Sequence, residues 1–311
     1  PGLDREISVT LMTPAKAKAM LPMRPSAAHK GDFGRTLIIA GSPNYIGAAS
    51  LAATAAYRVG AGMVTLAIPE SLKLGSAAQV IEPVYLPLPE SIPGELDPGA
   101  SSSLVFKEIP RHNALLMGCG TGQSPAAKIL CESILYSGKR LPATIVDADG
   151  LNSLARNFRA KWWTVFPQAA IITPHPGEMS KLTEKSTVEI QNDRIGQATL
   201  WSKTWNKITV LKGAHTVVAL PNGQVFLNPH INPGLASAGT GDVLAGIIAG
   251  LLSQGCPMGD AAALGVFVHG EAGDYLKSHL GNAGILASDL LPVLPKAINK
   301  LRTTQQYQKE I

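Results

Sequence analysis

Short apolar runs alternate with longer, helix-favouring stretches along most of this chain. The runs are rich in Ile, Val, Leu and Ala, and glycine, proline or polar residues close them. Such runs are typical of strands buried on both faces, and their alternation with helices predicts crossover units and a mostly parallel sheet. The predicted buried strands are residues 36–40, 63–68, 114–117, 144–146, 169–173 and 208–211.

Some of the stretches around these runs predict helices, and two other segments are predicted to be extended. Residues 80–88 are extended but contain prolines, so we expect them at a sheet edge, because proline cannot donate to a strand ladder. Asn222-Gly223, between residues 216–220 and 224–227, predicts a hairpin. Helices are expected at residues 14–21, 46–59, 125–136, 187–205, 240–254, 259–280 and 287–300, the fourth as one long amphipathic helix.

Composition and charge then narrow the class of protein. Apolar residues make up 45% of the 311 residues and charged residues 16%, which is typical of a packed globular domain. The net charge is +5, but no Lys/Arg run exceeds two residues, so a nucleic-acid-binding face is not indicated. The small excess fits a phosphate-bearing small substrate as well as it fits an ordinary solvated surface.

Cysteine use and hydropathy bear on the compartment. The cysteines Cys119, Cys131 and Cys256 are widely spaced and form no CxxC pair, so neither a zinc site nor a disulfide framework is indicated. This favours a reducing setting, and we expect a cytoplasmic protein. No apolar stretch approaches the ~18 residues that a membrane helix requires, so no membrane partner is expected.

Glycine and polar residues gather immediately after the predicted strands. In open α/β sheets, ligands bind at the carboxyl ends of parallel strands. We therefore expect these clusters to meet at one edge of the sheet and form one site. They are residues 41–42, 118–122, 147–152, 173–178 and 212–213.

The segment 232–242 carries the sharpest chemical signal, because glycines lead into an apolar helix that begins with an aspartate. Backbone amides at a helix N-terminus form an anion site, and Gly239, Thr240 and Gly241 would supply them. A carboxylate does not attract phosphate, so Asp242 is predicted as a base that takes a proton from a hydroxyl at the phosphoryl group. The alternative is an ordinary helix start in which Thr240 or Asp242 is the cap.

Other motifs leave more than one interpretation open. Lys212-Gly213 after a strand permits close contact with phosphate or ribose, but could be an exposed turn. The string Gly118 to Gly122 is not a Rossmann fingerprint, because it lies late in the chain and no acidic residue follows about twenty positions on. Asp147, Asp149 and Asn152 could bind Mg²⁺ or cap a helix, and His175 could be an ordinary loop histidine.

An ordered set of motifs resembles the NAD(P)H-hydrate dehydratases of the ribokinase-like superfamily, found as the carboxyl-terminal domain of bifunctional NAD(P)HX repair enzymes. The resemblance implies a three-layer α/β/α sandwich with a mostly parallel sheet over residues 29–311, preceded by a linker and helix at 1–28. The motifs are His29-Lys30-Gly31-Asp32-Phe33-Gly34, Gly41-Ser42, Tyr45-Ile46-Gly47-Ala48, Arg58-Val59-Gly60-Ala61-Gly62, Gly118-Cys119-Gly120-Thr121-Gly122, Val146-Asp147-Ala148-Asp149-Gly150-Leu151-Asn152, Thr173-Pro174-His175-Pro176-Gly177-Glu178, Lys212-Gly213-Ala214-His215-Thr216 and Ala238 to Asp242.

What the resemblance implies is a repair reaction: the S epimer of NADHX or NADPHX is phosphorylated by ADP or ATP and then loses phosphate. Mg²⁺ is implied on the nucleotide phosphates, with Asp147 and Asp149 as candidates on the protein. The implied catalytic group is Asp242 with Gly239, Thr240 and Gly241. The implied hydrate contacts are Gly47, Ala48, Gly120, Gly122, His175, Gly177, Glu178 and Asp242, and the implied nucleotide contacts are Lys212, Gly213, Ala214, His215, Thr216 and Gly241.

The resemblance also implies a homo-oligomer, a tetramer in many relatives, and fusion to an epimerase domain in a longer protein. Residue patterns do not choose between ADP and ATP. Two other functions stay open at this point. One is a small-molecule kinase of the same superfamily that phosphorylates a vitamin-like alcohol. The other is a nucleotide-binding module without catalysis, against which an intact Asp242 argues.

Overall fold

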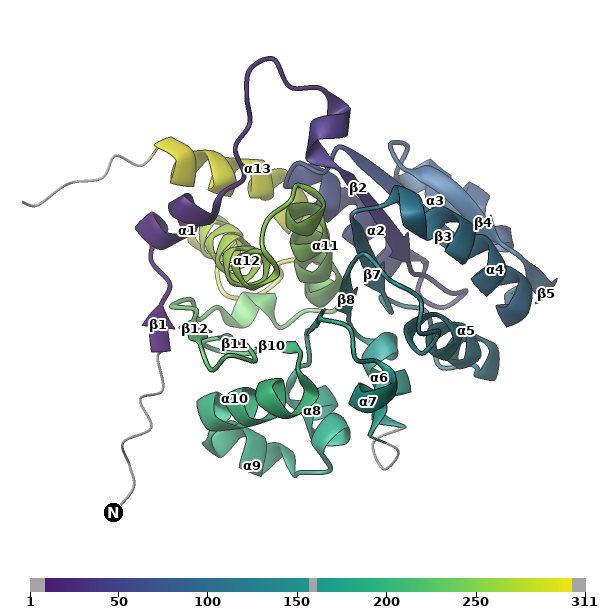
Figure 1. Cartoon of the computed structure of the whole chain (residues 1–311). Coiled ribbons are helices and arrows are strands. Elements are labelled where there is room, and N and C mark those ends of the chain that lie inside the picture. Colours follow the sequence, from purple (N-terminus) through teal and green to yellow (C-terminus); the bar gives the residue numbers. More distant parts are fainter. Residues whose placement is uncertain (1–8, 157–160, 304–311) are drawn as a thin grey trace, which may run out of the picture.

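The computed structural model describes residues 9–156 and 161–303, so residues 1–8 of the predicted linker lie outside it. A ten-stranded sheet runs through the centre in the order β1-β12-β11-β10-β9-β8-β7-β2-β3-β4 (Figure 1). The predicted parallel sheet is confirmed, and the proline-containing strand lies at its edge as expected. The parallel strands are β2 (Arg35–Ile39), β3 (Met63–Pro69), β4 (Val84–Leu88), β7 (Ala114–Met117), β8 (Ala143–Val146), β9 (Ala170–Ile172) and β10 (Ile208–Leu211).

The other end of the sheet is mixed. β11 (Val217–Ala219) pairs antiparallel with β10 and with β12 (Val225–Leu227), which confirms the hairpin around Asn222-Gly223. β1 (Val9–Leu11) then pairs parallel with β12. This strand was not predicted, because three residues are too few to show a period and its flanks read as a linker. A separate small sheet consists of β5 (Glu90–Ile92) and β6 (Glu95–Leu96).

Two helical layers cover the sheet, because alternate residues of each parallel strand face opposite sides. Ile38 belongs to one apolar cluster, whereas Leu37 and Ile39 belong to the other. The expected three-layer α/β/α sandwich is therefore confirmed (Figure 1). One layer contains α1 (Pro14–Met20), α2 (Ile46–Arg58), α11 (Thr240–Ser253), α12 (Met258–Leu280) and α13 (Ala287–Thr303), and the other contains α4 (Pro98–Glu108), α5 (Pro125–Leu135), α6 (Asp149–Ala155), α7 (Trp162–Val165), α8 (Pro176–Thr183), α9 (Thr187–Asn192) and α10 (Arg194–Trp205).

The single long helix predicted at 187–205 is wrong. The chain leaves helical geometry at Asp193, with φ −142° and ψ 62°, and so divides into α9 and α10. The Asp193 carboxylate accepts a hydrogen bond from the Gly196 amide at 3.0 Å and caps α10. A cap inside an amphipathic stretch interrupts the helix without changing its apolar period. The short helix α3 (Lys73–Gln79) and α4 were also not predicted.

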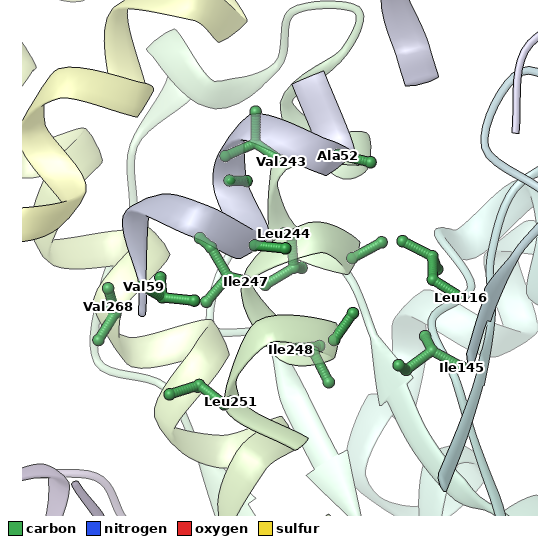
Figure 2. Close-up of a cluster of buried hydrophobic side chains, with 14 of the residues drawn as sticks. Ala52, Val59, Leu116, Ile145, Val243, Leu244, Ile247, Ile248, Leu251 and Val268 are labelled. Carbon is green, nitrogen blue, oxygen red and sulfur yellow. The ribbon is translucent and has the colours of Figure 1, made fainter. Parts of the chain in front are cut away.

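Small residues allow α2 and α11 to cross at very short range. A Cβ atom at Gly246 would collide with the backbone carbonyl of Ala52, and one at Gly250 would lie 2.6 Å from that of Ala56. Larger side chains such as Leu244, Ile247 and Ile248 fill the space around the crossing (Figure 2). This packing fixes α11 against the sheet, and with it the loop at its amino end.

The His29–Gly34 motif lies at the amino end of β2, the edge opposite the predicted site. It forms a 3₁₀ turn, Lys30–Phe33, closed by reciprocal hydrogen bonds between His29 and Asp32. Gly34 has φ +64° and packs against the Ser253 carbonyl, where no side chain fits. The motif therefore shapes the fold here and does not reach the site. Over the described ranges, no helix combines the length and apolarity needed to cross a bilayer.

Candidate active site

The polar clusters that follow the strands meet around the amino end of α11, as predicted. Two open cavities lie at this edge of the sheet. The larger, about 430 Å³, is lined by Lys212, Thr216, Thr240, Gly241 and other residues from β10 to α12. The smaller, about 420 Å³, is lined by residues 41–45, 121–124 and Asp149, among others.

The loop before α11 is held in a fixed shape. Gly239 has φ +89°, and an added Cβ would lie 2.7 Å from a Leu51 methyl group, so this position requires glycine. The Thr240 hydroxyl bonds the carbonyls of Leu235 (2.8 Å) and Ser237 (2.9 Å). The Thr240 amide donates to the Ser237 carbonyl at 3.4 Å, whereas the amides of Gly241 and Asp242 have no acceptor among the described residues. The result is a rigid turn with two free amides, which suits an anion and is called the anion-binding turn below.

Asp242 lies on the first turn of α11 and is partly buried. Burial raises the pKa of its carboxyl group to about 6, and the nearby Asp147 adds to the shift, while Cys119 and Lys212 oppose it. The Cys119 thiol bonds Asp242, and burial together with Asp242 and Asp147 raises the pKa of that thiol well above its usual range. Cys119 therefore stays protonated and donates. A carboxyl group of this pKa can both accept and return a proton near neutral pH.

Lys212 forms a charge cluster with two carboxylates. Its Nζ lies 2.7 Å from Asp147 Oδ1 and 3.7 Å from Glu178 Oε2. Burial alone would lower the pKa of Lys212, but the two carboxylates outweigh it and raise the pKa, so the ammonium group stays charged. A Cβ at Gly241 would lie 3.5 Å from this Nζ. The cation therefore stands beside the anion-binding turn.

His175 and Glu178 cap α8 reciprocally. The ring Nδ1 of His175 accepts from the amides of Gly177 (3.0 Å) and Glu178 (3.3 Å), and Glu178 Oε2 accepts from the His175 amide at 2.8 Å. Burial raises the pKa of Glu178 to about 7, with Lys212 opposing the shift and Asp147 adding to it. Burial and then Lys212 lower the pKa of His175. His175 therefore makes hydrogen bonds within its own loop, which fits the alternative of an ordinary loop histidine.

The loop Gly118 to Gly122 packs directly on the start of α2. Gly120 has φ +61°, and an added Cβ would lie 2.7 Å from that of Ala48. Nothing lies within 4 Å of the corresponding position at Gly47. The Gly122 amide donates to Asp149 Oδ2 at 2.9 Å, and Gly122 lines the smaller cavity. Gly120 and Ala48 are therefore in close contact, and Gly47 and Gly122 adjoin them along the chain.

Most of the predicted nucleotide-contacting residues line the larger cavity. They include Lys212, Gly213, Ala214, Thr216 and Gly241. His215 is the exception. Its backbone has φ +52°, its ring lies 3.1 Å from the Asn228 carbonyl, and it does not line this cavity.

The oxygen-rich side chains near the turn are already engaged with protein groups. Asp147 pairs with Lys212, and Asp149 accepts from the Gly122 amide and the Asn152 side chain. Within residues 9–156 and 161–303, no group of three or more His, Cys, Asp or Glu side chains could hold a metal ion. Proteins usually hold Mg²⁺ through one or two carboxylates together with the phosphates of a bound nucleotide. A carboxylate beside an anion site would suit a Mg²⁺ ion bound in this way.

Sequence reasoning missed several residues of the site. Cys119 stands inside the recognised Gly118–Gly122 string and directly follows β7, so its place at the strand end was a usable signal. Asn228, His230 and His269 also line the larger cavity, but they belong to no recognised motif. Only the folded topology brings the hairpin and α12 to this cavity.

Comparison with known proteins fits this geometry. The family model described as NAD(P)H-hydrate dehydratase matches residues 36–296. The bifunctional NAD(P)H-hydrate repair enzyme Nnr of Moorella thermoacetica is 42% identical over 94% of this chain and 54% of its own length. The ADP-dependent (S)-NAD(P)H-hydrate dehydratase of Neisseria meningitidis serogroup B is 32% identical over 91% of this chain and 90% of its own length.

A solved structure agrees. The ADP/ATP-dependent NAD(P)H-hydrate dehydratase of Bacillus subtilis, co-crystallised with ATP/Mg²⁺, superposes with a TM-score of 0.77 and 28% identity, covering 93% of this chain and 97% of that one. The chain spans about half the length of the bifunctional relatives it matches, such as 54% of the Moorella enzyme. The ordered motifs, the rigid anion-binding turn and these matches lead to one conclusion: the chain belongs to the NAD(P)H-hydrate dehydratase family.

Proposed function

We propose that this chain restores hydrated NADH or NADPH, the S epimer of NADHX or NADPHX, by phosphorylation from ADP or ATP followed by loss of phosphate. The observation that carries the proposal is Asp242: a partly buried carboxyl group on the first turn of α11, beside the anion-binding turn, with its pKa raised to about 6. It lies on the helix turn whose Thr240 and Gly241 line the larger cavity, the space that the proposal gives to the nucleotide.

In the first step, the ring hydroxyl of the hydrate attacks the terminal phosphorus of the nucleotide. Asp242 accepts the hydroxyl proton as the O–P bond forms, and the nucleotide leaves one phosphoryl group shorter. The turn at Gly239 to Gly241 holds the transferring group, with the Gly241 amide free to donate, and the neighbouring Lys212 ammonium offsets its charge. Mg²⁺ bound to the nucleotide phosphates would supply further charge neutralisation.

In the second step, phosphate leaves in place of hydroxide, which is a poor leaving group. The lone pair of the ring nitrogen expels the phosphate, and the released phosphate takes a proton from the neighbouring ring carbon, which restores the double bond. The larger cavity is assigned to the nucleotide, through Lys212, Gly213, Ala214, Thr216 and Gly241. The smaller cavity, which Gly122 lines, is assigned to the hydrate, and the proposal adds contacts from residues that line neither cavity: Gly47, Ala48, Gly120, His175, Gly177 and Glu178.

The test is incubation with NADHX, Mg²⁺ and either ADP or ATP, while the absorbance band of reduced nicotinamide is followed. We expect that band to grow and one phosphate to be released for each nucleotide consumed. A stable phosphate ester of the hydrate, without recovery of the band, would instead indicate a kinase. Nucleotide binding without consumption would indicate a binding module. Comparing the two nucleotides also decides which one this chain uses.

A further inference from the structure

His269 reaches the anion-binding turn from a different helix. It lies on α12, and its Nε2 is 3.0 Å from the backbone carbonyl of Thr240. A carbonyl oxygen only accepts hydrogen bonds, so Nε2 must carry the proton and donate. The bond therefore fixes the tautomer of the ring.

This bond acts on the anion site through one peptide unit. The Thr240 carbonyl and the Gly241 amide belong to the same planar trans peptide, so they point in opposite directions. A donor that holds the carbonyl thereby aims the Gly241 N–H away from His269, and it also polarises that N–H. Thr240 and Gly241 both line the larger cavity.

The second ring nitrogen of His269 is left as an acceptor. Burial lowers the pKa of His269 to about 4, with Lys212 and His230 adding to the shift and the Thr240 carbonyl opposing it, so the ring is neutral at physiological pH. With Nε2–H donated, Nδ1 offers a lone pair. His269 lines the larger cavity, and Nδ1 makes no hydrogen bond to any residue within the described ranges.

A lone pair at this point selects one kind of ligand group. It repels ionised phosphate oxygens and accepts only from a donor, and a nucleotide has donors on its sugar and on some bases. The ring bonds the first turn of α11 directly, and the sugar is the group that follows the phosphates in a nucleotide. Leu235, Leu244 and Val266 line the same cavity with apolar surface, which suits the flat base.

We propose that His269 is a positioning residue with two contacts: Nε2–H aligns the Thr240–Gly241 peptide for the phosphoryl group, and Nδ1 accepts a hydrogen bond from a sugar hydroxyl of the nucleotide. This rests on the proposed function. The two contacts of the ring can be separated by substitution. Glutamine places an amide N–H near the position of Nε2, whereas the shorter asparagine places an amide oxygen near that of Nδ1.

The experiment compares His269→Gln and His269→Asn with the unchanged protein, using ADP, ATP and their 2′-deoxy and 3′-deoxy forms. In the unchanged protein, removing the correct hydroxyl should weaken nucleotide binding roughly tenfold, the effect of one hydrogen bond. His269→Gln should raise the KM for the ribonucleotide to about that of the deoxy form, so the preference between the two forms is lost while most of kcat remains. His269→Asn should lose kcat but keep the preference for the ribonucleotide over the deoxy form.

Binding is measured by calorimetry without the hydrate, so the two proposals can fail separately. Loss of hydrate turnover with sugar discrimination intact would overturn only the proposed function. Equal binding of ribo and deoxy forms by the unchanged protein would overturn the sugar contact, even if the variants do not fold. A nucleotide preference that depends on the amino group of the base, and not on a sugar hydroxyl, would also overturn the sugar contact. His279→Gln, at an exposed position on the same helix, is the matched control and should change neither quantity.

Discussion

The two ends of helix α11 have opposite chemistry. From Gly246 onward the helix is apolar and almost completely buried, and it crosses α2 with backbone nearly touching backbone (Figure 2). At its first turn, Asp242 stands among Cys119, Asp147 and Lys212, and the pKa values of several of these groups are displaced.

The comparison shows how one element can stabilise the fold at one end and, under the proposed function, carry the reaction at the other. A group in the low-dielectric interior interacts strongly with nearby charges only if its position is fixed, because mobile groups and water would screen it. The close crossing supplies that fixed position. Changes at the packed end should therefore act on folding, and changes at the polar end should act on turnover.

Asp242→Asn should have the largest effect. The amide cannot accept the hydroxyl proton, so turnover should fall roughly 10²- to 10⁴-fold, while nucleotide binding survives. Stability should not fall. The raised pKa means that folding disfavours the ionised form, so an uncharged isostere is as stable or more stable at neutral pH. Steady-state kinetics and a thermal unfolding midpoint measure the two quantities, and unchanged turnover would remove Asp242 from its role.

Gly246→Ala tests the packed end. The added methyl group meets the Ala52 carbonyl of α2, which cannot move without separating the helices, so unfolding free energy should fall by about 1–3 kcal/mol. Gly75→Ala is the matched control, because nothing lies within 4 Å of its added Cβ, and it should be neutral or slightly stabilising. Denaturant titration gives both values. Equal stability of the two variants would show that the crossing tolerates expansion.

The fold could be predicted from sequence wherever burial left a simple pattern. The parallel strands are short apolar runs, and β7 was predicted with its observed bounds. Prediction failed where one residue decided the outcome. Asp193 interrupts a helix by capping its second half, and β1 is a strand only because β12 offers it a partner. Neither effect changes the hydrophobic period of the surrounding sequence.

The site was predictable only in part, for the same reason. The motif that contains Asp242 is local, so the sequence alone indicated its chemistry. The partner of Lys212 is not local. Asp147 follows β8, two strands away in the sheet, and it shares no motif with Lys212. His269 comes from a helix whose sequence gives no sign of an active site. Contacts of this kind depend on the three-dimensional arrangement of the elements.

The third expected effect is smaller than those of the two substitutions above: turnover should depend on pH through Asp242 at the polar end of α11. Asp242 must be ionised to act as a base, so the rate should rise with pH through about 6 and be about tenfold lower at pH 5 than at pH 7. Glu178, with a pKa of about 7, titrates nearby. Glu178→Gln removes that second titration and should leave the rise of the rate near pH 6 in place. If this variant lost the rise, the rise would be assigned to Glu178.

Cys119→Ala should have the smallest effect, and it isolates one contact at the polar end. The thiol stabilises the ionised form of Asp242 by donating a hydrogen bond, so removing it should raise the pKa of Asp242. The acid limb of the rate profile should therefore move to higher pH, with little change in the plateau. Cys119→Ser keeps a donor at this position and should restore the limb toward its original place. If alanine and serine gave the same profile, the thiol would matter only as packing, and the pKa of Asp242 would be set by burial and the nearby charges without it.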